Sequence, residues 1–224
     1  MRRILLSVLF LVNLGWLSPA TAASQVLRMH HDMPADSALH KGVMVFKQLV
    51  EARSQGQYRV EVFAANSLGD DLEVVQQLQI GAVQAAPIPS AKLSNLAPAL
   101  QMLDLPFLFA SEASADRFMD GPAGARLLAT LPARGLVGAS FWESGFKQMT
   151  CQNVLSRPSG LKGAHVRVME SPILAAQFRA VGGLPVTVSF AETYIALQQG
   201  MVNCQENPIV SIAKMRLHEV QNEI

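Results

Sequence analysis

Alternating strand-like and helix-like segments, together with a weak internal repeat, predict an α/β protein built from two lobes. Short apolar runs at 26–29, 82–86 and 165–168 fit buried strands, and segments between them carry apolar residues three or four positions apart, as an amphipathic helix does. This alternation is typical of helices that flank a sheet. We therefore expect mixed, largely parallel sheets covered by helices.

The internal repeat relates residues 71–89 to residues 190–208. Six of the nineteen aligned positions are identical, and both copies place a helix, a glycine and a short strand before a proline-containing loop. An open alternative is that any helix, glycine and strand in succession look alike. If the repeat is real, two similar lobes place a ligand site in the crevice between them.

The first lobe is expected to span 23–144 and the second lobe 145–208. Capping residues, glycines and a change of period from 3.6 to 2 mark the elements. In the first lobe we expect a strand at 26–29, a helix from a cap at Asp36 or Ser37 to Gly56, a strand at 58–62, a helix at 71–80 ended by Gly81, and strands at 82–86 and 136–142.

The second lobe repeats this kind of succession. Ser189 and Glu192 are spaced as a capping box for the last helix before the final strand. We expect an element at 146–150, a loop at 156–160, a strand at 165–168, a helix at 171–180, a strand at 185–188, a helix closed by Gly200, and a tail at 209–224 that begins a long helix.

Residues 1–22 have the features of a secretory signal peptide. Arg2 and Arg3 precede an apolar run at 4–17, and Ala20-Thr21-Ala22 forms an A-x-A cleavage site. The alternative is a membrane anchor, but crossing ~30 Å of hydrocarbon takes about 20 residues and this run is shorter. We expect cleavage after Ala22 or Ala23 and export to the periplasm.

Composition and motifs exclude several classes of function. The 224 residues carry 18 Lys+Arg against 17 Asp+Glu, which gives no electrostatic footprint for nucleic acid, and 50% are hydrophobic, too many for a disordered chain. The sequence lacks G-x-S-x-G, H-E-x-x-H, P-loop and C-x-x-C motifs. Adjacent His30 and His31 point to opposite faces of a strand and cannot share a metal. We expect no catalytic residues, metal or cofactor.

Arg167 is the most informative charged residue. Apolar neighbours alternate around it in a predicted strand, and a buried charge without a partner is costly. One interpretation is a salt bridge to Glu170 or Glu206. The other is a guanidinium fork open to the cleft, which binds a carboxylate through two parallel hydrogen bonds.

Cys151 and Cys204 follow two predicted strands of the second lobe. In an exported protein this arrangement favours a disulfide, which by chain entropy stabilises the fold by about 4 kcal/mol before strain. The alternative is a pair of buried free thiols that pack as small hydrophobic groups.

Several separated motifs follow one another along the chain. They are Ser67-Leu68-Gly69, Leu78 to Gln84, Leu103 to Phe109, Arg167 to Pro172, Tyr194 to Gly200 and Gln205-Glu206-Asn207-Pro208. Together they resemble one known family, the DctP-type substrate-binding proteins of tripartite ATP-independent periplasmic (TRAP) transporters, and the similarity runs in order from about Val26 to Ile224.

The resemblance implies a monomeric two-lobed protein that closes over an organic acid and delivers it to TRAP permease membrane subunits driven by an ion gradient. Arg167 matches the arginine that pairs with the ligand carboxylate, Asn207 a polar group near it, and Phe190 an aromatic residue of the pocket. Lys147 stands where many members have a second arginine, so it is either a second cation for the ligand or a surface lysine beside the cleft. From the first lobe, His30 or His31 and the loop Pro87 to Ser90 are expected to contribute.

Two rival functions remain at this point, a two-lobed periplasmic sensor that feeds a signalling partner and a periplasmic enzyme on the same lobes. The resemblance also implies a longer mature chain, with a long helix and further elements after residue 224. We therefore expect the sequence to be a fragment or a truncated product that lacks the C-terminal part of the fold.

Overall fold

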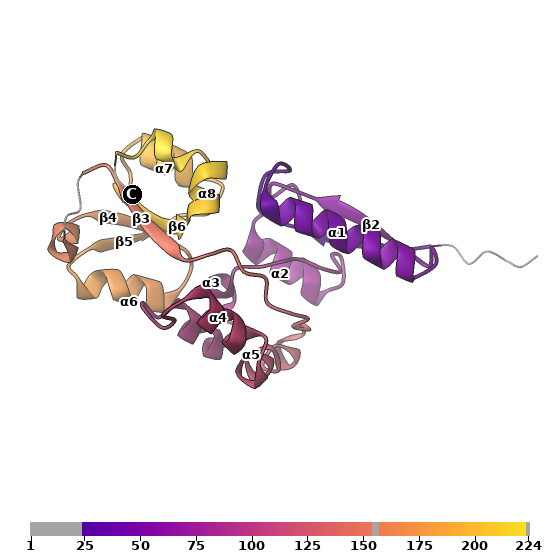
Figure 1. The fold of residues 1–224 in the computed structure, drawn as a ribbon. Coiled ribbons are helices and arrows are strands. Elements are labelled where there is room, and N and C mark those ends of the chain that lie inside the picture. The colour runs from indigo at the N-terminus through magenta and orange to yellow at the C-terminus, as the bar shows by residue number, and fades with distance from the viewer. Residues whose placement is uncertain (1–23, 154–156, 223–224) are drawn as a thin grey trace, which may run out of the picture.

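The computed structural model describes residues 24–153 and 157–222, in which two separate sheets define two lobes (Figure 1). The signal peptide expected at 1–22 lies outside the described residues. Within the described part, no helix combines the length and the apolar composition needed to span a membrane.

The first lobe is built on two parallel strands whose register pairs Gln25 with Tyr58 and His30 with Phe63. Helix α1 packs on this pair, and Val43 and Val60 are fully buried between them. Ser37 caps α1 by accepting a hydrogen bond from the backbone N–H of His40. The elements are β1 (Gln25–His30), α1 (Ala38–Arg53), β2 (Tyr58–Phe63), α2 (Asp71–Gln79), α3 (Ser90–Leu93), η1 (Pro98–Asp104), α4 (Glu112–Met119), α5 (Pro122–Leu128) and η2 (Pro132–Arg134).

Two strands expected in this lobe do not form. Within 82–86 only Ala85 forms a β-bridge, to Met29. The backbone N–H of Arg28 donates to the side-chain oxygen of Gln84, so it is not available for a further backbone hydrogen bond between the two segments. The segment 136–142 has no strand partner among the described residues. Its apolar side chains Leu136 and Phe141 pack instead on the helical cluster around Leu127.

The second lobe is a four-stranded mixed sheet in the order β3-β6-β4-β5. Strand β4 lies parallel to β5 and β6, whereas β3 is antiparallel to β6. Helix α6 packs Leu174 and Phe178 onto Val166 and Val168 of β4. The elements are β3 (Lys147–Cys151), η3 (Pro158–Leu161), β4 (His165–Val168), α6 (Pro172–Ala180), β5 (Leu184–Thr187), α7 (Thr193–Gln198), β6 (Cys204–Pro208), α8 (Ile209–Lys214) and η4 (Leu217–Glu219).

The repeat appears in the structure as a helix followed by a left-handed glycine in each lobe. Gly81 after α2 and Gly200 after α7 have φ values of 74° and 72°, which favour glycine. Only the second copy continues into a ladder strand, β6. The expected capping box of α7 is absent, because Ser189 Oγ donates to the Glu192 carboxylate rather than accepting from the helix backbone.

The segment after β6 is not the single helix that we expected. Helix α8 ends at Lys214, Arg216 takes a left-handed φ of 57°, and the chain turns so that Leu217 is fully buried beside Leu197 and Ile212. Figure 1 shows α8 on the side of the second lobe that faces α1. There Lys214 Nζ lies 2.7 Å from Asp36 Oδ2, so this segment does contact the first lobe.

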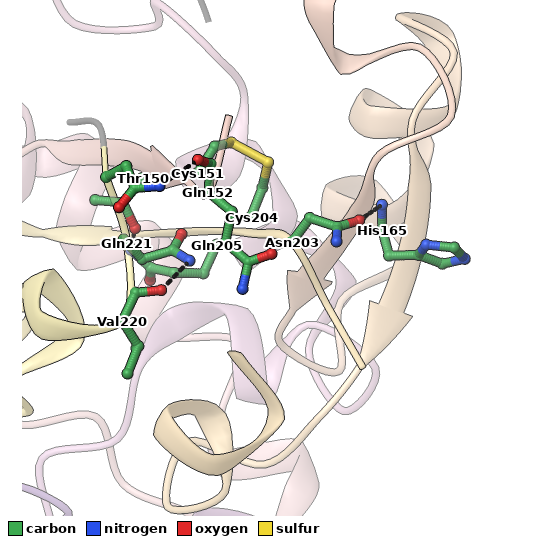
Figure 2. Close-up of a disulfide and its surroundings, with 10 residues drawn as sticks. Thr150, Cys151, Gln152, His165, Asn203, Cys204, Gln205, Val220 and Gln221 are labelled. Atoms are coloured by element: carbon green, nitrogen blue, oxygen red, sulfur yellow. Dashed lines mark hydrogen bonds between the residues drawn. A yellow bond between two sulfur atoms is a disulfide. The ribbon is translucent and has the colours of Figure 1, made fainter. Parts of the chain in front are cut away.

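A disulfide joins the adjacent ends of β3 and β6 (Figure 2). Cys151 and Cys204 are directly paired in the antiparallel register, and both are buried. The chain beyond η4 returns to the same place, where the backbone N–H of Asn222 donates to the carbonyl of Cys151. The disulfide therefore fixes the edge of the sheet that carries the candidate site.

Candidate functional site

Arg167 lies at the centre of the second sheet and is completely buried. Its strand pairs on both sides, with Val186 of β5 and Gln205 of β6 opposite the arginine. Its Nε donates to the carbonyl of Val188 at 2.9 Å, and its Cζ lies 5.9 Å from the centre of the Phe190 ring. These contacts hold the plane of the guanidinium in one orientation, with cation–π stabilisation from the aromatic face.

The two terminal nitrogens of Arg167 have no hydrogen-bond partner among the described residues. No carboxylate oxygen of that part of the chain comes within 4.0 Å, so the expected alternative of a salt bridge to Glu170 or Glu206 is not observed. Burial lowers the pKa of Arg167 from its ordinary value, although arginine keeps its charge. More distant carboxylates act in the opposite direction: Glu206, Glu170, Asp71 and Asp32.

Lys147, the expected second cation, is held in ion pairs. Its Nζ lies 3.0 Å from Glu206 Oε1 on the neighbouring strand and 3.6 Å from Asp104 Oδ1 of the first lobe. Burial raises the pKa of both carboxyl groups, and Lys147 opposes that rise. The ammonium group therefore serves two carboxylates of the protein itself.

Next to Arg167, two amide side chains of β6 and one hydroxyl of β3 form a chain of hydrogen bonds. Asn207 donates from Nδ2 to the side-chain carbonyl of Gln205, which in turn donates to Thr150 Oγ1 at 2.8 Å. All three side chains are buried. Asn207 and Phe190 thus lie on elements that adjoin Arg167, whereas His30 is in the other lobe.

The first lobe contributes a second buried cation that the sequence analysis missed, Lys92 of α3. Its Nζ lies 2.8 Å from Glu170 Oε2 of the second lobe and 4.0 Å from Asp71 Oδ2 at the start of α2. Burial, with the nearby Asp32 carboxylate, raises the pKa of Asp71 to about 7. Because these partners are distant in the sequence, no local motif marks Lys92.

The expected first-lobe residue, His30, ends β1 and is fully buried next to His31. Burial lowers the pKa of His30, and a side-chain hydrogen bond with Asn66 opposes that shift. His31 instead pairs with His40, Nε2 to Nδ1 at 2.9 Å, and burial lowers its pKa to about 4. No cluster of three or more metal-ligating side chains occurs within 24–153 and 157–222.

The amino-acid sequence matches one protein family over most of the chain. The model of bacterial extracellular solute-binding proteins, family 7 (DctP), matches residues 29–224. The chain belongs to this family. The two-lobed α/β fold expected from the sequence is confirmed by the solved structures that it resembles.

Relatives in this family differ in what their names say they bind. The C4-dicarboxylate-binding periplasmic protein DctP of Rhodobacter capsulatus is 34% identical over 204 residues, 91% of this chain and 61% of that protein. The 2,3-diketo-L-gulonate-binding periplasmic protein YiaO of Escherichia coli is 29% identical over 214 residues, 95% of this chain and 65% of that protein.

Solved structures show the same contrast between ligands. The sugar acid binding protein DctPAm of Advenella mimigardefordensis, in complex with galactonate, superimposes with a TM-score of 0.86 at 32% identity, over 88% of this chain and 64% of that one. A TRAP periplasmic solute binding protein of Shewanella oneidensis with bound succinate superimposes with a TM-score of 0.86 at 35% identity, over 89% of this chain and 66% of that one. The chain thus spans less than two thirds of the length of these relatives.

Proposed function

We propose that this protein captures an organic acid in the periplasm by clamping its carboxylate on Arg167, and passes it to TRAP permease membrane subunits. The observation that carries the proposal is a completely buried guanidinium whose two terminal nitrogens have no partner among the described residues. A carboxylate fits that fork through two parallel charge-assisted hydrogen bonds.

The contacts between the lobes support capture by closure. Lys92 reaches Glu170, Asp104 accepts from Ser171 Oγ at 3.3 Å, and Gln177 donates to the carbonyl of Asp104. Glu170 and Ser171 follow the strand that carries Arg167, and Gln177 lies on the next helix, α6. Closing two lobes around a bound ligand excludes water, and the Coulomb attraction to Arg167 then increases.

Transport is favoured over the sensor and enzyme alternatives by the names of the relatives, which are periplasmic binding proteins. We infer a monomer without a catalytic step, exported by a cleaved signal peptide at 1–22. Asn207 and Phe190 complete the carboxylate end of the site, and His30 faces it from the first lobe. We assign Lys147 to the protein's own ion pairs rather than to the ligand.

The experiment is a thermal-shift screen over organic acids, followed by titration calorimetry with the acid that raises the melting temperature most. Arg167→Ala should weaken binding at least about 100-fold, because two charge-assisted hydrogen bonds are lost. Arg179→Ala, an exposed arginine on α6, is the matched control and should bind like the wild type. Unchanged affinity in a folded Arg167→Ala variant would overturn the proposal.

A further inference from the structure

Three cations lie at the junction of the lobes, and two of them are neutralised within the protein. Lys92 faces the carboxylates of Glu170 and Asp71, and Lys147 faces those of Glu206 and Asp104. Among the residues that the structure describes here, Arg167 alone keeps charged nitrogens without a partner. The described part of the site therefore offers unpaired cationic donors for one negative charge.

A second negative charge on a ligand would meet an acidic surrounding. The carboxylates close enough to alter the pKa of Arg167 come from both lobes: Asp32, Asp71, Glu170 and Glu206. In a buried site a like charge at short range costs several kcal/mol. A ligand with one carboxylate on Arg167 and an uncharged remainder avoids this cost.

The first lobe offers groups that suit hydroxyls. Asp71 Oδ1 is buried without a hydrogen-bond partner in the described residues, and the buried ring of His30 has at most one side-chain partner there, Asn66. A hydroxyl both donates and accepts, so it can serve the carboxylate oxygen and either histidine tautomer. A buried polar atom left unsatisfied costs about 1–3 kcal/mol, which favours a ligand that supplies such groups.

We propose, building on the function proposed above, that the ligand is a hydroxylated monocarboxylate of the sugar-acid kind and that Lys147, held by Glu206 and Asp104, selects against dicarboxylates. Each of the two lysines already faces two carboxylates of the protein. Neither ammonium group is therefore free to pair with a second carboxylate on the ligand. Specificity then comes from the ion pairs around Arg167, whereas affinity comes from Arg167 itself.

Matched pairs of acids test this proposal in the unaltered protein. Galactonate and galactarate differ only in the terminal carbon, a hydroxymethyl group in one and a carboxylate in the other, and erythronate and meso-tartrate give a four-carbon pair that differs in the same way. By calorimetry the monocarboxylate of at least one pair should bind, and at least about tenfold more tightly than its dicarboxylate. Equal or tighter binding of the dicarboxylate in the pair that binds, or no binding by either monocarboxylate, would overturn it.

Glu206→Gln tests the role of the lysine. Removing one of the two carboxylates that face Lys147 should raise the affinity for the dicarboxylate about tenfold, in the pair of acids that binds. The preference for the monocarboxylate over the dicarboxylate should become smaller by the same factor. Glu192→Gln, an exposed acid that bonds only Ser189, is the charge-matched control and should leave the preference unchanged. An unaltered preference in folded Glu206→Gln would contradict the assignment of Lys147.

The outcomes separate the two proposals. Tight dicarboxylate binding that disappears in Arg167→Ala would end the present inference and leave the proposed function intact. Absence of binding by every acid of the screen would contradict both. Binding of galactonate or erythronate that survives in Arg167→Ala would contradict the proposed function and, with it, the present inference, which takes its affinity from Arg167.

Discussion

The two lobes hold their polar groups in different ways. In the second lobe Arg167 lies on a strand paired on both sides, in a sheet whose edge is fixed by the Cys151–Cys204 disulfide. In the first lobe Asp71 and Lys92 lie in the first turns of helices, beside a sheet of only two strands in the described residues. The difference indicates an anchor held between two paired strands, opposite polar groups that lie on helices beside a smaller sheet.

The ion pair between the lobes gives the largest expected change in stability. Lys92→Met leaves Asp71 and Glu170 without their cation, and breaking a buried pair by removing one partner costs about 3–5 kcal/mol. Denaturant unfolding at pH 8 measures the loss, and exposed Lys41→Met is the control. A free energy of unfolding equal to that of the wild type would show that charge pairs do not join the lobes.

The disulfide should stabilise the second lobe by a slightly smaller amount. Reduction, or replacement of Cys151 and Cys204 by serine, opens a link across 53 residues of sequence, and such links typically contribute about 2–4 kcal/mol. Denaturant unfolding with and without dithiothreitol measures the contribution of the disulfide to the free energy of unfolding. The serine variant should be insensitive to the reductant, and a wild type that is equally insensitive would contradict the prediction.

The first lobe should respond to acid through His31. Its pKa is lowered to about 4 by burial, so its contribution to stability is present above the unfolded value of 6.5 and is lost as the pH falls towards 4. The free energy of unfolding of the wild type should therefore decrease relative to His31→Gln over that window. A difference between the two proteins that stays constant from pH 7 to pH 4 would rule out this role.

Local sequence patterns predicted the elements that local forces determine. The cap at Ser37, the strand around Arg167 and the helices before Gly81 and Gly200 all follow from periodicity, capping and glycine geometry. The strands expected at 82–86 and 136–142 do not form, because a strand needs a neighbour and local pattern does not supply one.

The residues of the candidate site show the same difference between local and long-range determinants. Arg167 could be found because a charge interrupts an apolar strand, a signal carried by its immediate neighbours. Lys92 and the partners of Lys147 could not be found in this way, because their ion pairs join residues that are more than 20 positions apart. Long-range pairing is fixed by the packing of the lobes, which the local pattern does not contain.

The central claim is that Arg167 is the anchor for a ligand carboxylate, and a thermodynamic cycle tests it most directly. Wild type and Arg167→Ala are each titrated with the acid that binds most tightly and with its amide, in which the charge is removed. The cycle should show a coupling of about 100-fold, because either change alone already removes the interaction. Effects of the two changes that simply multiply would mean that Arg167 and the carboxylate do not meet, and would contradict the account.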